Sequence, residues 1–118
     1  MTSDSPKIVR ESLSLAEVRD IAQQRFGDMV KACVDIGRGI IALGGELHSD
    51  EEAVLLEDGS VQAEVWGINI YPDESGDDWI EFDSMINVRP AQRNRSRGVD
   101  DPAIQTKIRQ IVEGLVRR

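Results

Sequence analysis

Apolar and polar residues alternate along residues 29–36, which is the pattern of a half-buried strand. A glycine turn at residues 37–39 separates this strand from an apolar stretch at residues 40–47, so the two segments predict a β-hairpin. One register that keeps the apolar side chains of both strands on the core face also sets Lys31 opposite Glu46, a favourable cross-strand pair.

The alternation returns at residues 64–71 and 79–88, on either side of a polar loop, and predicts a second hairpin. Pairing Ile70 with Ile80 gives both strands an apolar inner face. It also puts Tyr71 opposite Trp79 on the outer face, as an exposed aromatic pair of the kind that can mark an interface. Such pairs also stabilise hairpins that have no partner, so both alternatives stay open.

Two capping boxes predict helix starts. The first, at residues 14–17, precedes an apolar helical stripe that ends at Gly27. The second, at residues 49–52, predicts a short helix that ends near residue 58, and it places three acidic residues at the helix N-terminus. A tight hairpin turn at residues 58–59 is the alternative for this segment.

The clearest amphipathic helix is predicted over residues 102–116, where Asp101 is the N-cap and Pro102 the first helical residue. One apolar stripe runs along this helix, and it consists of Ile104, Ile108, Ile111, Val112 and Leu115. We expect this stripe to pack on the sheet.

These elements predict an α+β fold with one domain over residues 7–118, preceded by a flexible N-terminus at residues 1–6. The sheet is mainly antiparallel, with two hairpins plus a short strand at residues 7–10, and it is accompanied by two longer helices and one short helix. We expect the helices to cover one face of the sheet. The other face then carries polar side chains and is open to a homodimer: Lys31, Asp35, Glu46, His48, Asn69, Glu81, Asp83 and Asn87.

Composition agrees with one globular domain. The chain has 118 residues, of which 40% are apolar and 31% charged. No apolar run approaches the roughly 20 residues of a membrane helix, and the first residues lack the basic start and apolar core of a signal peptide. Cys33 is the single cysteine, which excludes an intramolecular disulfide. We expect a cytoplasmic protein without membrane contact.

The net charge of −8 is unevenly distributed. Residues 1–88 carry 6 basic and 19 acidic residues, whereas residues 89–118 carry 8 and 3. No basic residue lies between Arg38 and Arg89, a stretch that holds 13 acidic residues. An acidic body repels nucleic acid and anionic membranes, and the few aromatic residues also argue against an RNA partner.

Several strings of residues resemble a known pattern in their order and spacing. They are GGELH at residues 44–48, WGINIYP at 66–72, SMINVRP at 84–90 and NRSR at 94–97. This pattern is similar to that of a small prokaryotic family classed as a domain of unknown function, and the resemblance covers nearly the whole chain. It implies a one-domain soluble protein and carries no activity, ligand or catalytic residue.

The arginine-rich segment that begins at residue 89 is the one place where an anion would be attracted. Guanidinium groups donate hydrogen bonds in pairs and suit phosphate or carboxylate. The candidate residues for binding a small anionic ligand are Arg89, Arg93, Asn94, Arg95 and Arg97. In the alternative, these arginines dock on the acidic body of the protein and neutralise it.

A second candidate site combines His48 with Glu46 or Asp83, which share one sheet face if the strands form as predicted. A histidine beside carboxylates has a raised pKa and can act as acid or base. The allowed hairpin registers place Cys33 roughly 13–20 Å from His48, too far for a nucleophile–base pair.

Metal and cofactor sites are not expected. The acidic loop at residues 73–78 resembles a calcium loop but lacks the glycine at its sixth position and the glutamate at its twelfth. The glycine pairs match neither the dinucleotide nor the P-loop spacing. The sequence therefore favours a non-enzymatic binding or interaction module. The alternative is a small enzyme that acts on an anionic substrate through the arginine-rich loop and His48 with Glu46 or Asp83.

Overall fold

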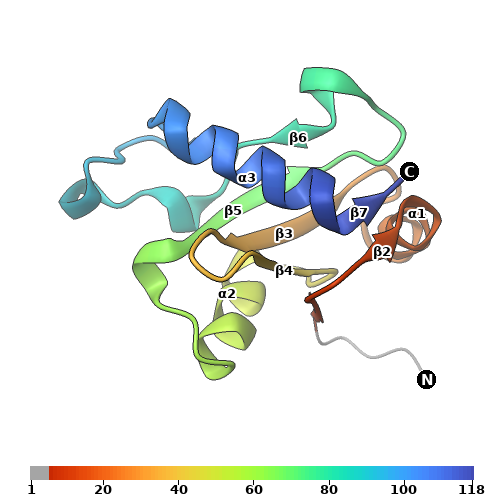
Figure 1. Cartoon of the computed structure of the whole chain (residues 1–118), viewed down its shortest axis with the longest axis horizontal. Coiled ribbons are helices and arrows are strands. Elements are labelled where there is room, and N and C mark those ends of the chain that lie inside the picture. Colours follow the sequence, from red (N-terminus) through yellow and green to blue (C-terminus); the bar gives the residue numbers. More distant parts are fainter. Residues whose placement is uncertain (1–5) are drawn as a thin grey trace.

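A five-stranded sheet is the central layer of the structure, a computed structural model that describes residues 6–118. Its strand order is β1 (Lys7–Val9), β4 (Ile40–Leu43), β3 (Val30–Asp35), β5 (Val65–Ile70) and β6 (Ile80–Glu81), and every neighbouring pair is antiparallel (Figure 1). The predicted α+β class, with one mainly antiparallel sheet, is confirmed. The flexible N-terminus predicted for residues 1–6 lies outside the described residues except for Pro6.

One face of the sheet is covered by α1 (Leu15–Arg25) and α3 (Pro102–Leu115), and Figure 1 shows α3 crossing in front of β3 and β5. The predicted stripe of α3 is confirmed, because Ile108 and Val112 are fully buried among the inward residues of the strands. Ser14 and Asp101 accept hydrogen bonds from the first-turn amides of their helices, as the capping signals predict.

The other face is covered in part by α2 (His48–Glu57), so the expectation that all helices lie on one face is wrong. The reason is that the middle of this face is apolar as well. Leu55 of α2 is fully buried in a second cluster with Cys33, Ala42 and Val65. The face that we expected to be open to a homodimer is therefore open only beside α2.

Strand β4 ends at Leu43 and not at residue 47, because Gly44 takes a positive φ of 92° and turns the chain away from the sheet. Helix α2 then begins at His48, with Leu47 as an N-cap that makes no side-chain capping bond. The short helix is confirmed and the predicted cap at Ser49 is wrong. The register places Cys33 opposite Ala42, so the predicted pairing of Lys31 with Glu46 does not form.

The second hairpin is shorter than predicted. Its register is correct, with Ile70 opposite Ile80 and Asn69 opposite Glu81, but β6 stops at Glu81. The strand predicted as far as residue 88 is instead an irregular segment with a 3-10 turn at Met85–Asn87. Further 3-10 turns lie at Gln62–Glu64, Gly76–Asp78 and Pro90–Gln92.

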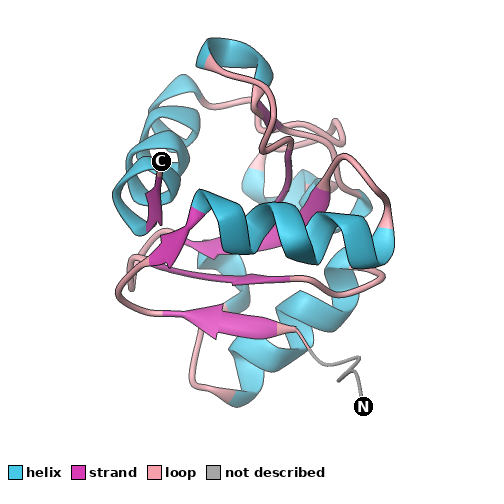
Figure 2. Cartoon of the chain, turned by 90° about the vertical axis from the view of Figure 1, so that its right-hand side faces the viewer, coloured by secondary structure: helices cyan, strands magenta, loops and turns pink. Residues whose placement is uncertain are grey.

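The structure also contains two short strands that the sequence did not predict, and they form a second, two-stranded sheet. β2 (Leu13–Ser14) precedes α1 and pairs in parallel with β7 (Val116–Arg117), which follows α3 (Figure 2). This pairing joins the two helices of the apolar face at one end.

Candidate functional site

The segment of residues 82–100, which we call the arm, replaces the missing end of β6. It crosses the sheet at Gly67, where an added Cβ would lie 2.6 Å from Ser84. The amide of Gly67 donates to Oδ1 of Asn87 (2.8 Å), and Nδ2 of Asn87 donates to the carbonyl of Gly67 (2.9 Å). The Asn87 side chain, fully buried, thus takes the place of a neighbouring strand. The prediction that Asn87 lies on an open face is wrong.

Asn94 holds the arm together from inside. Its side chain is buried, donates to the carbonyls of Asn87 (2.7 Å) and Gly98 (2.8 Å), and accepts from the amide of Asp100 (2.8 Å). Since these bonds occupy both ends of the amide, Asn94 supports the arm and does not face a ligand.

Arg89 docks on the protein itself. It donates to the carbonyl of Val65 (2.6 Å) and to Glu52 on α2 (3.2 Å), and its guanidinium lies 5.0 Å from the ring centre of Trp66. Burial lowers its pKa, and the Glu52 carboxylate acts in the opposite direction. This contact agrees with the docking alternative.

The other three arginines have different surroundings. Arg97 donates to Oδ1 of Asp83 (2.7 Å). Arg93 and Arg95 are exposed, and their guanidinium groups form no ion pair within residues 6–118. Arg93 has φ 62°, a left-handed conformation that costs a non-glycine residue roughly 1–2 kcal/mol. The five residues predicted to bind an anion therefore do not converge on one site.

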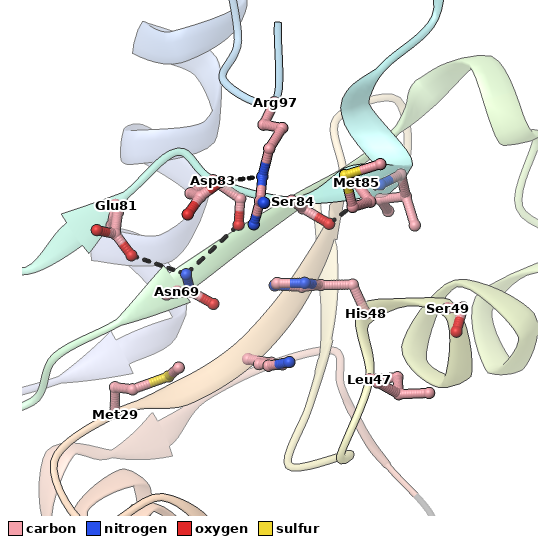
Figure 3. A pocket seen from close by; sticks show the side chains of 12 residues that line it. Met29, Leu47, His48, Ser49, Asn69, Glu81, Asp83, Ser84, Met85 and Arg97 are labelled. Atoms are coloured by element: carbon pink, nitrogen blue, oxygen red, sulfur yellow. Dashed lines mark hydrogen bonds and ion pairs between the residues drawn. The ribbon is translucent and has the colours of Figure 1, made fainter.

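A pocket of about 400 Å³ lies on the open part of the second face, beside the first turn of α2. We call it the His48 pocket. Its charged and larger polar residues come from five separate segments of the chain and are Lys31, His48, Asn69, Glu81, Asp83 and Arg97. Its apolar residues are Met29, Leu47, Met85 and Ile86. Figure 3 shows Asn69, Glu81 and Asp83 on one side of the pocket and His48 opposite them.

His48 is held in one tautomer. Its Nε2 lies 2.8 Å from the carbonyl oxygen of Ile68, which can only accept, so Nε2 carries the proton and Nδ1 of the neutral ring can only accept. Burial lowers the pKa of His48, while the Ile68 carbonyl and the Asn69 side chain act in the opposite direction. The raised pKa expected from nearby carboxylates is therefore wrong, because burial outweighs them.

A row of three polar side chains crosses three strands along the floor of the pocket. Lys31 on β3 lies opposite Asn69 on β5, which lies opposite Glu81 on β6. Nδ2 of Asn69 donates to Glu81 (2.8 Å) and to the carbonyl of Asp83 (3.4 Å). Oδ1 of Asn69 is buried and makes no hydrogen bond within the described part of the chain.

Glu46 lies outside the pocket. It follows the turn at Gly44, is largely exposed, and lies 3.5 Å from the guanidinium of Arg25 at the end of α1. The structure therefore brings His48 together with Asp83 and not with Glu46. The shared strand face predicted for Glu46 and His48 does not exist, because β4 ends before either residue.

Cys33 is close to His48, contrary to the predicted separation of roughly 13–20 Å, which assumed a longer hairpin. Helix α2 turns back over the sheet, and the Cys33 thiol donates to the main-chain carbonyl of His48 (3.3 Å). Burial raises the pKa of Cys33 well above its ordinary value, so the thiol is not activated as a nucleophile.

The aromatic pair of the second hairpin is not exposed as predicted. Trp79 is buried in the main core, and the guanidinium of Arg118 lies 4.4 Å from its ring centre. Tyr71 is half-buried, and its hydroxyl donates to Glu81 (3.3 Å). Trp79 therefore has a packing role, and an interface role for Tyr71 stays a prediction.

Two acids that the sequence analysis did not expect to be buried are buried in the structure. Asp35 was predicted on the open face, but it lies at the end of β3, where its Oδ1 accepts from the amides of Gly37 (2.9 Å) and Arg38 (3.1 Å). The second is Glu51. Glu51 on α2 is fully buried; its Oε2 accepts from the amide of Gly45 (3.2 Å), and its Oε1 makes no hydrogen bond within residues 6–118. Burial raises its pKa to about 9. Its place in an acidic helical turn had suggested only a charge at a helix N-terminus.

Comparison with family models gives one match, over residues 7–115, to a family described as Protein of unknown function (DUF5674). The chain belongs to this family. The resemblance stated from the sequence motifs, to a small family of unknown function, is thereby confirmed. No curated protein and no solved structure matches the chain.

Two further findings concern the described residues. None of their helices has the length and apolar composition that crossing a membrane requires. No group of three or more histidine, cysteine or acidic side chains among them is placed to hold a metal ion.

Proposed function

We propose that this DUF5674 chain is a non-enzymatic binding module whose ligand is a small molecule held in the His48 pocket. One observation supports this most strongly: five separate segments bring a polar floor and an apolar rim to one concave site. Leu47 and Met85 on the rim are 54% and 66% exposed, so together they offer apolar surface to a ligand. Small-molecule sites combine apolar walls with a few placed polar groups in this way.

The pocket is tested by titrating the ¹⁵N-labelled protein with a small-molecule library that contains amines, amides, alcohols, carboxylates and phosphates. We expect binders to shift the amide signals of His48, Asn69 and Glu81. Met85→Ser removes part of the rim and should weaken the binding of these compounds. Leu56→Ser, a matched change at an exposed apolar residue outside the pocket, should leave their binding unchanged. If no compound shifts the pocket signals, the proposal is wrong.

Catalysis is the second candidate, because His48, Asp83 and Arg97 line the same pocket. A neutral imidazole can act as a base, and Arg97 could orient an anionic substrate if it left Asp83. The same spectra test this candidate: a bound compound that is converted over hours, with loss of conversion in His48→Gln, would favour an enzyme.

The remaining proposals concern the location of the protein in the cell, the charge of its ligand and its oligomeric state. A cytoplasmic location is supported by the free, buried thiol of Cys33, which suits a reducing compartment. A small anionic ligand and a homodimer both remain proposals. The first is an outcome of the titration, and the second is tested by the mass of the protein in solution.

A further inference from the structure

The hydrogen-bonding groups of the His48 pocket are unevenly used, and this points to the kind of ligand. Four side chains in the pocket can donate through N–H groups, and three of them already donate to the protein. Asn69 donates to Glu81, His48 to the carbonyl of Ile68, and Arg97 to Asp83. The fourth, Lys31, lies at the end of the row away from Glu81, and Arg97 keeps N–H groups besides the Nε that donates to Asp83.

Several acceptors of the pocket are also unused. Nδ1 of His48 has no proton in the neutral ring, and Oδ1 of Asn69 is buried without a hydrogen bond within residues 6–118. The carboxylates of Glu81 and Asp83 each have a second oxygen beside the one that accepts from Asn69 or Arg97. An unsatisfied buried acceptor costs free energy that a donor from a ligand recovers.

We propose that the polar end of the ligand is an N–H donor, an ammonium or a primary amide, carried on a small apolar body. This inference rests on the proposed function, because it names the ligand class of the same pocket. The polar end lies over the row of Asn69 and Glu81, and the apolar body lies against Met29, Leu47 and Met85.

Charge favours the same class over an anion. Arg97 is neutralised by Asp83, so the remaining charges on the floor are Lys31 and Glu81, at opposite ends of the row. An anion near Asn69 meets the carboxylate of Glu81 there. A primary amide has a carbonyl that can face Lys31 and an NH₂ that can face Glu81, so it uses both ends of the row.

The test uses three probes with one branched body and different polar ends: 3-methylbutanamide, 3-methylbutylamine and 3-methylbutanoate, with inorganic phosphate as a fourth. Kd values are measured from the shifts of pocket amides at pH 7.5. We expect the amide and the amine to bind at least about tenfold more tightly than the carboxylate or phosphate. Glu81→Gln removes one charge and should weaken the amine about three- to fivefold, with the amide changed less.

Glu113→Gln, the same substitution at an exposed residue of α3 on the opposite face, is the matched control and should leave every Kd unchanged. If the carboxylate or phosphate binds the pocket more tightly than the amide, the inference is wrong and the proposed function stands. If library compounds bind the pocket but neither N–H donor does, the inference is also wrong. If nothing binds there, both fail.

Discussion

The face of the sheet under α1 and α3 is stabilised by one continuous apolar core, whereas the face under α2 and the arm combines a small apolar cluster with polar side chains that bond to main-chain groups. On the first face, Ile108 and Val112 fill a continuous core. On the second, Asn87 and Arg89 bond to main-chain groups of β5, and Asn94 bonds to main-chain groups within the arm. Apolar burial tolerates small shifts, but a hydrogen bond requires a defined distance and direction. The polar face is therefore the one that can hold ligand-binding groups in fixed positions.

The largest effect is expected on the apolar face. Ile108→Ala removes a fully buried side chain and should lower the free energy of unfolding by about 3–4 kcal/mol, since a cavity remains in the core. Denaturation by urea measures this loss. Ile104→Ala, at a half-buried position of the same stripe, is the control and should cost clearly less. A loss below about 0.5 kcal/mol for Ile108→Ala would show that the two faces do not differ in this way.

The next effect is expected on the polar face. Asn87→Ala leaves the amide and the carbonyl of Gly67 without their partner, and it removes one of the two hydrogen bonds to the carbonyl of Arg97, which also accepts from the amide of Ser84. We expect a loss of about 2–3 kcal/mol, because each unsatisfied buried group costs roughly 1–3 kcal/mol and water reaches part of the opened arm. Gln92→Ala removes one exposed hydrogen bond, made by the side-chain amide of the same arm, and is the matched control.

Hydrogen exchange separates the two substitutions further. Asn87→Ala should lose amide protection in the arm and at Gly67 while α3 stays protected, and Ile108→Ala should lower protection throughout the sheet. Uniform loss of protection in Asn87→Ala would contradict the idea that the arm is a separate polar attachment.

The same contrast explains how much the sequence could predict. The stripe of α3 and the pairing of Ile70 with Ile80 follow from periodicity, because their side chains share one apolar environment. Asn87 sits in an alternating stretch that resembles a strand, and only the crossing at Gly67 decides that its amide replaces the strand. A side chain that bonds to a backbone 20 residues away leaves no periodic signal in the sequence.

The sequence predicted only part of the candidate site, because here too contacts between distant segments decide which residues meet. His48, Asp83 and Arg97 were chosen for their chemistry and do meet in one pocket, but Glu46 was added from a strand that ends at Leu43. Asn69 and Glu81 were placed on the correct face by register, although neither was given a role in the site. The buried position of Glu51 depends on how α2 packs, which its acidic surroundings in the sequence conceal.

The smallest effect is expected for Glu51. It tests whether a buried polar group on the second face can lower the stability of the folded protein. Glu51 has a folded pKa of about 9, against an ordinary value of 4.5 for the unfolded chain. Between these values, unfolding releases a proton, so the stability that the protonated acid contributes is complete below pH 4.5 and is lost as the pH rises towards 9. Lys31 and Asp50 are the charged groups that act on it, in opposite directions.

Glu51→Gln removes this ionisation and should raise the free energy of unfolding at pH 7. The linkage alone amounts to about 3 kcal/mol, at roughly 1.4 kcal/mol for each pH unit above 4.5. The new NH₂ group offsets part of this, because Oε1 of Glu51 has no hydrogen-bonding partner within residues 6–118, so we expect a net gain of about 1–2 kcal/mol. Urea denaturation at pH 5, 6, 7 and 8 should show the gain growing with pH. Glu57→Gln, the same substitution at an exposed position of α2, should differ from the parent by less than about 0.5 kcal/mol throughout. A gain for Glu51→Gln that does not grow with pH would show that the acid is ionised in the folded protein, and that the second face accommodates its charge as readily as its hydrogen bonds.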